Sequence, residues 1–295
     1  AQLYGETGIA FNKYNTLCQL VMLQKAGSAA LNAAESALFM PDLFTYFLTG
    51  KKVCEHSIAS TSELLKAGKA EYSDALFGKF GLKKLFPRVV PSGTVAGELK
   101  EEIVKELRLK NSIPVIATLG HDTASAFFAA PVEGENAAIL SSGTWSLLGA
   151  VLDKPIVTEK AAAAGYTNEI GFGGKVRFLR NIVGLWIIQE CKREWDRRAD
   201  AVDFAGLVKM AEGAKPFMAQ IDVDDPRFMA PGNMPARIQE YCRETHQEVP
   251  QSRGEISRVV YESLALKYRW GVEGLQKDLL GKHGNELHIE GGRSK

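Results

Sequence analysis

Apolar residues recur with helical spacing in several stretches of the chain and gather in short runs between them. The helical stretches cover residues 17–31, 41–50, 183–195 and 255–280. In the last stretch, one stripe carries most of the apolar residues: Ile256, Val259, Val260, Leu264, Trp270 and Leu275. The short runs predict strands at residues 115–119, 139–142, 147–152 and 287–289, and glycines at 171–174 predict a further hairpin. Helices alternating with strands predict mixed α/β domains.

A change of composition at residues 131–136 marks a predicted domain boundary. This stretch mixes Pro, Gly, Glu and Asn between two apolar segments, as hinges and linkers often do. We therefore expect one domain over residues 1–132 and a second over residues 133–295.

Composition places the chain among ordinary globular proteins. Hydrophobic residues make up 45% and charged residues 24% of the 295 positions, and Lys plus Arg exceed Asp plus Glu by one (36 against 35). With so small a net charge, the chain has no overall electrostatic attraction to nucleic acid or to an anionic membrane surface, so neither is an expected partner. The scattered cysteines (Cys18, Cys54, Cys191 and Cys242) suit a reducing compartment, and we predict a cytoplasmic protein. The five histidines show no spacing typical of a transition-metal site.

Two polar motifs carry the candidate chemistry. Residues 115–125 (VIATLGHDTAS) read as an apolar strand, a glycine turn and a helix start, which places Asp122 where a buried strand opens into a crevice. Residues 139–146 (ILSSGTWS) read as a strand followed by a Ser-Ser-Gly-Thr turn, whose N–H and O–H groups can bind a phosphate. One motif supplies a base and the other a phosphate cradle, so together they indicate phosphoryl transfer.

Both motifs closely resemble matching segments of the rhamnulokinases, which are sugar kinases of the FGGY family. Further stretches resemble rhamnulokinase segments in the same order: residues 41–50, 178–186, 231–238 and 264–270. The resemblance implies two actin-like (ribonuclease H-like) ATPase domains, both incomplete here. It also implies transfer of the γ-phosphate of ATP, with Mg²⁺, to the 1-hydroxyl of L-rhamnulose.

The same resemblance assigns expected roles to individual residues. Asp122 coincides with the catalytic base of the family, and the expected sugar contacts are His121, Asp122, Thr123 and Asn181. The expected ATP contacts are Gly143, Thr144, Gln189, Gly291 and Gly292. No residue of the chain is expected to be a permanent metal ligand. Small-molecule sugar and ATP are the expected partners.

Most of these residues also have a structural interpretation. Asp122 before a helix is a favoured N-cap, and Thr123 can belong to the helix start. The Ser142–Thr144 turn can be an ordinary hairpin, and Asn181 and Gln189, around an apolar helical segment, can be caps or solvated amides. Gly143 serves both interpretations, because a backbone that approaches a phosphate closely leaves no room for a Cβ.

The resemblance begins inside the first domain and ends within the turn that holds adenosine, so we expect an internal fragment. Without the N-terminal phosphate hairpin, the chain is expected to show little kinase activity. Two alternatives stay open at this point. One is another FGGY kinase, acting on L-fuculose or xylulose, and the other is a non-catalytic actin-like module that binds sugar or nucleotide.

Overall fold

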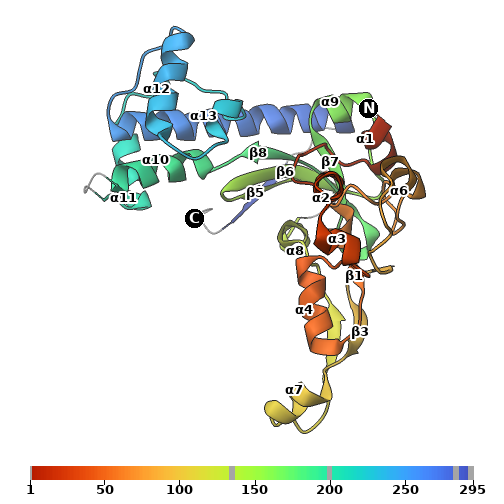
Figure 1. Ribbon diagram of the computed structural model, residues 1–295. Helices are drawn as coiled ribbons and strands as arrows, with labels where there is room; N and C mark the ends of the chain where they lie inside the picture. Colours follow the sequence, from red (N-terminus) through yellow and green to blue (C-terminus); the bar gives the residue numbers. More distant parts are fainter. Residues whose placement is uncertain (1, 133–136, 198–200, 282–285, 292–295) are drawn as a thin grey trace. The chain divides into compact units, whose positions relative to one another are not determined.

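The structure, a computed structural model, describes residues 2–132, 137–197, 201–281 and 286–291 (Figure 1). Contacts divide the chain into two compact units. Unit 1 comprises Ala1–Glu135 and Ala150–Arg180, and unit 2 comprises Asn136–Gly149 and Asn181–Lys295. The chain therefore passes between the units three times. These units are defined by contacts and are not the two sequence domains expected over residues 1–132 and 133–295. The boundary between those domains stays a prediction.

Short helices make up much of unit 1. They are α1 (Gln2–Thr7), α2 (Thr16–Lys25), α3 (Ala29–Ala33), α4 (Met40–Thr49), α5 (His56–Ser60), α6 (Asp74–Phe80), α7 (Glu101–Glu106), α8 (Asp122–Ala129) and α9 (Glu159–Ala163). The helix expected at 41–50 is confirmed as α4, which ends at Gly50 in the left-handed region. The stretch at 17–31 was expected to be one helical segment, but α2 ends before Gly27, whose φ of 63° is left-handed, and α3 follows.

Two small sheets also belong to unit 1. β1 (Cys54–Glu55) pairs in parallel with β2 (Val89–Val90), and β3 (Thr94–Glu98) pairs antiparallel with β4 (Pro114–Ala117). The expectation of a buried strand before Asp122 is wrong, because only Ala117 of β4 is buried. A short apolar run does not by itself show that a strand is buried, and here Pro114 and Ile116 of β4 are exposed.

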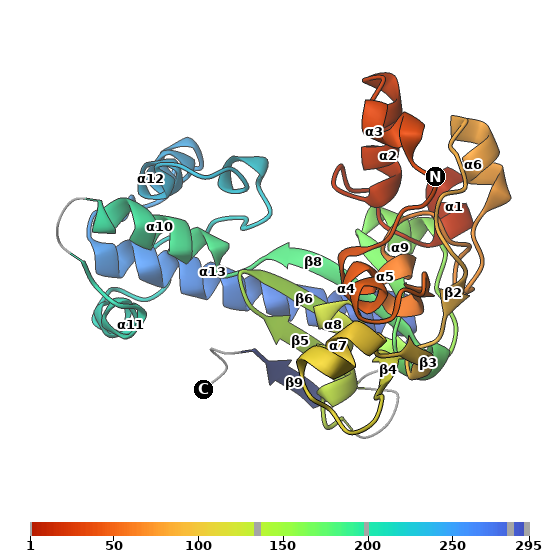
Figure 2. The same cartoon turned by 60° about the horizontal axis from the view of Figure 1, so that its bottom comes forward.

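A five-stranded sheet has the order β7-β8-β6-β5-β9. Its strands are β5 (Ala137–Ser142), β6 (Trp145–Leu152), β7 (Tyr166–Ile170), β8 (Val176–Val183) and β9 (Glu286–Glu290). The two predicted hairpins are confirmed: β5 pairs antiparallel with β6, and β7 with β8 through the short 3₁₀ turn η1 (Phe172–Gly174). The last strand, β9, lies parallel to β5 (Figure 2).

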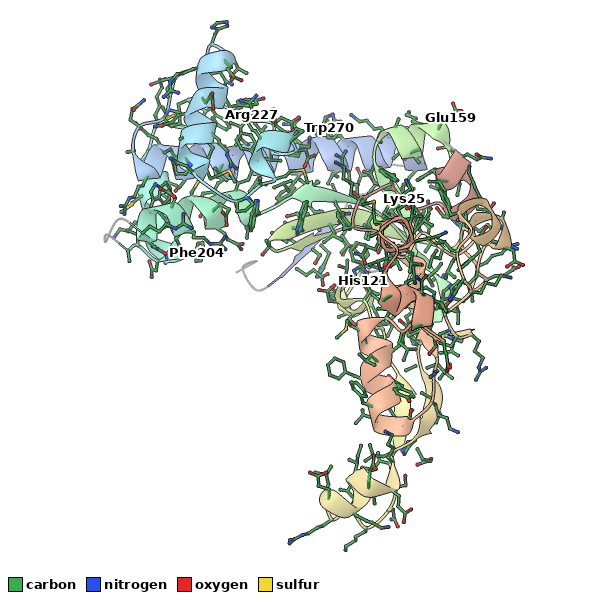
Figure 3. All side chains as sticks on the ribbon, in the orientation of Figure 1. Lys25, His121, Glu159, Phe204, Arg227 and Trp270 are labelled. Carbon is green, nitrogen blue, oxygen red and sulfur yellow. The ribbon has the colours of Figure 1, made fainter. Side chains whose placement is uncertain are left out.

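Unit 2 is completed by α10 (Trp186–Asp196), α11 (Phe204–Glu212), the 3₁₀ turn η2 (Pro226–Phe228), α12 (Met234–Glu244) and α13 (Arg253–Glu273). α13 begins with a capping box between Ser252 and Glu255 and continues into the π-helical turn η3 (Gly274–Leu280). The helix expected from residue 183 begins only at Trp186, because Val183 still belongs to β8. Figure 3 labels Phe204 on α11 and Trp270 on α13.

One apolar core joins the helices of unit 2 to its strands. Ile187 and Cys191 of α10, Ile238 of α12 and Val259 of α13 are fully buried in the same cluster as Leu148 of β6. Burial of such side chains contributes about 1.5–3 kcal/mol each, so this core fixes the hairpin of β5 and β6 against α10 and α13.

Candidate functional site

Asp122 is the first residue of α8, directly after the loop that leaves β4. Its Oδ1 accepts the N–H of Thr123 at 2.7 Å and the Thr123 hydroxyl at 3.4 Å. The side chain is nevertheless 96% exposed. The N-cap position belongs to His121, so the carboxylate is not used as a cap and is available to a ligand.

The loop before Asp122 is held by the buried carboxylate of Glu55. Its Oε2 accepts the N–H of Gly120 at 3.0 Å and the hydroxyl of Ser57 at 2.5 Å. The Ser57 oxygen in turn accepts the N–H of His121 at 3.3 Å. Gly120 has little room for a side chain, because an added Cβ would lie 3.1 Å from Cβ of Pro41. Two successive amides before Asp122 are thus fixed by one carboxylate and one hydroxyl.

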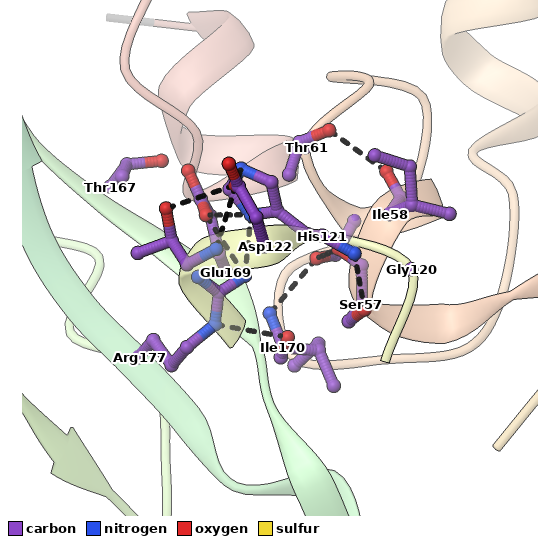
Figure 4. A network of polar contacts seen from close by, with 12 residues as sticks. Ser57, Ile58, Thr61, Gly120, His121, Asp122, Thr167, Glu169, Ile170 and Arg177 are labelled. Atoms are coloured by element: carbon purple, nitrogen blue, oxygen red, sulfur yellow. Dashed lines mark hydrogen bonds and ion pairs between the residues drawn. The ribbon is translucent and has the colours of Figure 1, made fainter. Parts of the chain in front are cut away.

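A second set of charged groups contacts the imidazole of His121 (Figure 4). Nη2 of Arg177 lies 3.1 Å from Nδ1, and Oε2 of Glu169 lies 3.3 Å from the same atom. On the other side of the ring, Nε2 lies 3.6 Å from Oδ1 of Asp122. His121 is therefore placed between a buried ion pair and the exposed carboxylate.

Glu169 and Arg177 are directly paired across the hairpin of β7 and β8, and Nη2 of Arg177 lies 3.0 Å from Oε2 of Glu169. Their side chains are only 9% and 1% exposed. Burial, the largest single influence, raises the pKa of Glu169, but Arg177 and His121 together lower it by more, so the net pKa lies below its usual value. Burial lowers the pKa of Arg177, and the charge of Glu169 opposes that change. The two charges stabilise each other in a site that water scarcely reaches.

The predicted phosphate turn lies in unit 2, between β5 and β6. Gly143 donates its N–H to Trp145 and accepts at its carbonyl from Leu185, both at 3.0 Å, while the carbonyl of Thr144 accepts from Trp186, also at 3.0 Å. These bonds fix the turn against the start of α10. An added Cβ on Gly143 would meet only the Trp145 carbonyl, at 3.4 Å, so packing within the chain does not demand glycine here.

The structure brings two expected ATP contacts together. The hydroxyl of Thr144 donates to Oε1 of Gln189 at 3.2 Å, and Thr144 is exposed. Below the turn, the hydroxyls of Ser146 and Tyr268 lie 2.6 Å apart, which ties β6 to α13. Burial raises the pKa of Tyr268, so this phenol stays protonated at neutral pH.

Gly291 follows β9 and packs directly on the backbone of Ser142. Its φ of 130° lies outside the range that residues with a side chain usually adopt, and an added Cβ would overlap the Ser142 carbonyl oxygen. Gly291 therefore belongs to the same local assembly as the Ser142–Thr144 turn. Gly292, also an expected ATP contact, lies outside the described residues.

Asn181 does not adjoin a helix, contrary to expectation, but lies half-buried on β8. By strand alternation it shares a face with Arg177. Its expected contact with sugar stays a prediction.

Sequence reasoning missed Glu55, Glu169 and Arg177. The available signal was a charged residue between Val176 and Phe178 of an apolar strand, since a charge at such a position is rarely buried without a partner.

No three His, Cys, Asp or Glu side chains among the described residues are grouped as a metal site would require. In the same part of the chain, no helix is long and apolar enough to cross a bilayer.

Comparison with known proteins identifies both regions of the chain. Residues 1–129 match the N-terminal domain, and residues 138–295 the C-terminal domain, of the FGGY family of carbohydrate kinases. The chain belongs to this family. Its two-domain α/β fold is the fold that the sequence resemblance implied.

Among curated relatives, the rhamnulokinase of Bacteroides thetaiotaomicron is 42% identical over 296 residues, covering 100% of this chain and 60% of the relative. The rhamnulokinase of Enterococcus faecalis is 40% identical, covering 99% of this chain and 58% of the relative. The FGGY chain thus spans about three fifths of the length of these curated relatives.

Solved structures of similar fold are more distant in sequence. A ligand-bound xylulose kinase from Lactobacillus acidophilus gives a TM-score of 0.71 at 17% identity, covering 99% of this chain and 58% of that one. The glycerol kinase of Plasmodium falciparum with ADP gives 0.71 at 15% identity with the same coverage. At these identities the likeness concerns the fold.

Proposed function

We propose that this chain carries the sugar base and part of the nucleotide site of an ATP-dependent kinase that phosphorylates the 1-hydroxyl of L-rhamnulose. The observation that carries the proposal is the position of Asp122. Its carboxylate is exposed at the start of α8, while Thr123 orients one of its oxygens and Glu55 and Ser57 fix the preceding backbone. An accessible carboxylate on a fixed backbone suits a general base.

In the proposed reaction, Asp122 accepts the proton of the sugar hydroxyl as that oxygen attacks the γ-phosphorus of ATP. A positioned general base contributes about 10²–10⁴-fold to the rate. His121 beside it contacts another oxygen of the sugar, and Thr123 and Asn181 are further proposed contacts. L-Rhamnulose is favoured over other ketoses because the two similar relatives described above are rhamnulokinases.

On the nucleotide side, the Ser142–Thr144 turn fits a phosphate. The Thr144 side chain is exposed and the backbone of the turn is fixed by Leu185 and Trp186, so only the Thr144 hydroxyl has to turn from Gln189 toward a phosphate. Gln189 and the glycine at 291 are the remaining described contacts proposed for ATP. Mg²⁺, which prefers oxygen ligands, would enter with the phosphates and neutralise their charge.

A sugar panel tests this proposal. The full-length protein is assayed with Mg-ATP and L-rhamnulose, L-fuculose or D-xylulose, with ADP release and phosphorus NMR of the product as readouts. We expect the highest kcat/KM with L-rhamnulose and a phosphate ester at its 1-position. A higher kcat/KM with either other ketose would overturn the substrate, and sugar binding without turnover of any sugar would show a binding module instead.

A further inference from the structure

The buried pair of Glu169 and Arg177 has a consequence for the proton of His121. A guanidinium has five N–H donors and no acceptor. Nη2 of Arg177 is 3.1 Å from Nδ1 of His121, so an N–H on Nδ1 would put two donors face to face. Nδ1 must therefore be the bare, accepting nitrogen.

The position of Glu169 agrees with this assignment. Its Oε2 is 3.3 Å from Nδ1, yet within the described part of the chain this oxygen has no aligned hydrogen-bond partner. A proton on Nδ1 directed at Glu169 would have supplied one. The carboxylate instead interacts with Nη2 of Arg177, at 3.0 Å, so this one nitrogen contacts both acceptors.

From these contacts we propose that Arg177 is a positioning residue. It donates to Nδ1 of His121 and so places an N–H at Nε2, next to the carboxylate of Asp122. The guanidinium is itself fixed, because its Nε donates to the carbonyl of Ile170 at 3.3 Å. Ile170 is held in turn by Ser60 of α5, at 2.9 Å.

This inference rests on the proposed function for its chemical meaning. Nε2–H is a donor and Asp122 is an acceptor, and the two atoms concerned are 3.6 Å apart. Adjacent oxygens of a sugar can satisfy both groups at once: one hydroxyl donates to Asp122, and the neighbouring oxygen accepts from His121. The pair therefore selects substrates with an oxygen acceptor on the carbon next to the phosphorylated position. With the opposite tautomer, two acceptors would face the sugar.

The direct test needs no substrate. Nitrogen NMR of the labelled chain distinguishes bare from protonated ring nitrogens, and it is recorded over a range of pH values up to the alkaline side. The His121 signals are assigned from the spectrum of His121→Asn. We expect a neutral ring with bare Nδ1 and protonated Nε2. A proton on Nδ1, in either a neutral or a charged ring, would overturn the proposal even if the protein proves to be a kinase.

Variants test the cause. In Arg177→Met, Glu169 is left as the neighbour of Nδ1, so we expect the proton to move to Nδ1. Arg180→Met, a change of the same kind on the opposite face of β8, should leave the tautomer as it is. Because Arg177→Met leaves a buried carboxylate unpaired and can unfold the chain, the double variant Glu169→Gln/Arg177→Met is measured as well. There we expect a mixture of tautomers, and an unchanged Nε2–H form in both variants would contradict a role for Arg177.

Kinetics of the full-length protein supply the functional readout. Arg177→Met should lower kcat/KM for the sugar about 10- to 100-fold, as expected when a reacting group is misplaced, with KM for ATP unchanged. A parallel rise in both KM values would indicate a general structural role and would contradict positioning. If the wild-type protein phosphorylates no sugar, the proposed function fails, whereas the tautomer measurement still decides the role of Arg177.

Discussion

Gly291 lies so close to Ser142 that no side chain can be added to it without moving the backbone of one of them. Ser142 ends β5, and Gly291 directly follows β9, the parallel neighbour of β5. The contact links the turn proposed to bind phosphate to the turn proposed to bind adenosine. One glycine therefore determines how two parts of the proposed nucleotide site meet.

Gly291→Ala is expected to weaken ATP binding and to destabilise the end of β9. Overpacking of a fitted site typically costs about 1–3 kcal/mol, so the affinity for ATP should fall about tenfold or more, while sugar affinity stays the same. Calorimetric titration and thermal unfolding measure the two effects. Gly274→Ala is the matched control, because Gly274 is helical and an added Cβ there meets nothing within 4 Å. Equal ATP affinity in Gly291→Ala and wild type would show that Gly291 is not part of the ATP site.

Asp122→Asn should bind both substrates and turn over at least about a hundredfold more slowly, because the amide keeps the shape and loses the base. Steady-state kinetics and equilibrium sugar binding of the full-length protein check this. Asp74→Asn is the control, since Asp74 is also the first residue of a helix, α6, and pairs with Lys84 on the surface. Near-normal turnover of Asp122→Asn would rule out the assigned base.

Thr144→Val keeps the volume of the side chain and removes the hydroxyl that faces Gln189. Loss of one hydrogen bond to a charged phosphate typically costs about 1.5–3 kcal/mol, so KM for ATP should rise by roughly tenfold or more with sugar affinity little changed. Thr245→Val, an exposed threonine in the same unit whose hydroxyl bonds to the carbonyl of Tyr241, should leave both constants unchanged. A fall in sugar affinity with an unchanged KM for ATP would show that the turn contacts the sugar and not ATP.

Local signals made the two motifs visible in the sequence. The glycine turn before Asp122 and the Ser-Ser-Gly-Thr hairpin depend on residues within a few positions of each other. The hairpin of β5 and β6 and that of β7 and β8 were both confirmed. Asn181 was placed wrongly because an apolar run cannot distinguish the end of β8 from the start of α10. The periodicity of the apolar residues alone does not show where the strand ends and the helix begins.

Long-range partners were not predictable in the same way. Glu55 lies 65 residues before Gly120, and its role appears only when β1 and the loop before α8 are folded together. Glu169 and Arg177 meet through the register of a hairpin, which a shift of one residue would abolish. The sequence therefore predicted the candidate groups of the loop and the turn, and it missed the buried charges that hold the loop and contact His121.

Asp42, another buried carboxylate, gives unit 1 a pH dependence. Its side chain is 2% exposed, and its Oδ1 accepts the N–H of Glu55 at 3.0 Å. Burial raises the pKa of Asp42 to about 6, against the hydrogen bond from Glu55, which lowers it. The folded state therefore binds this proton more tightly than the unfolded state does.

The sign of the effect follows from that difference. Protonated Asp42 contributes stability that is fully present below about pH 4 and is lost as pH rises through about 6. Asp42→Asn should remove this part of the slope and, if the amide oxygen keeps the bond to Glu55, stabilise the protein at pH 7 by on the order of 2 kcal/mol. Urea unfolding between pH 4 and 8 measures it. Asp74→Asn is the control, because the hydrogen bond from Lys84 lowers the pKa of Asp74, which gives a slope of opposite sign. Parallel stability curves for wild type and Asp42→Asn would show that Asp42 does not titrate in this range.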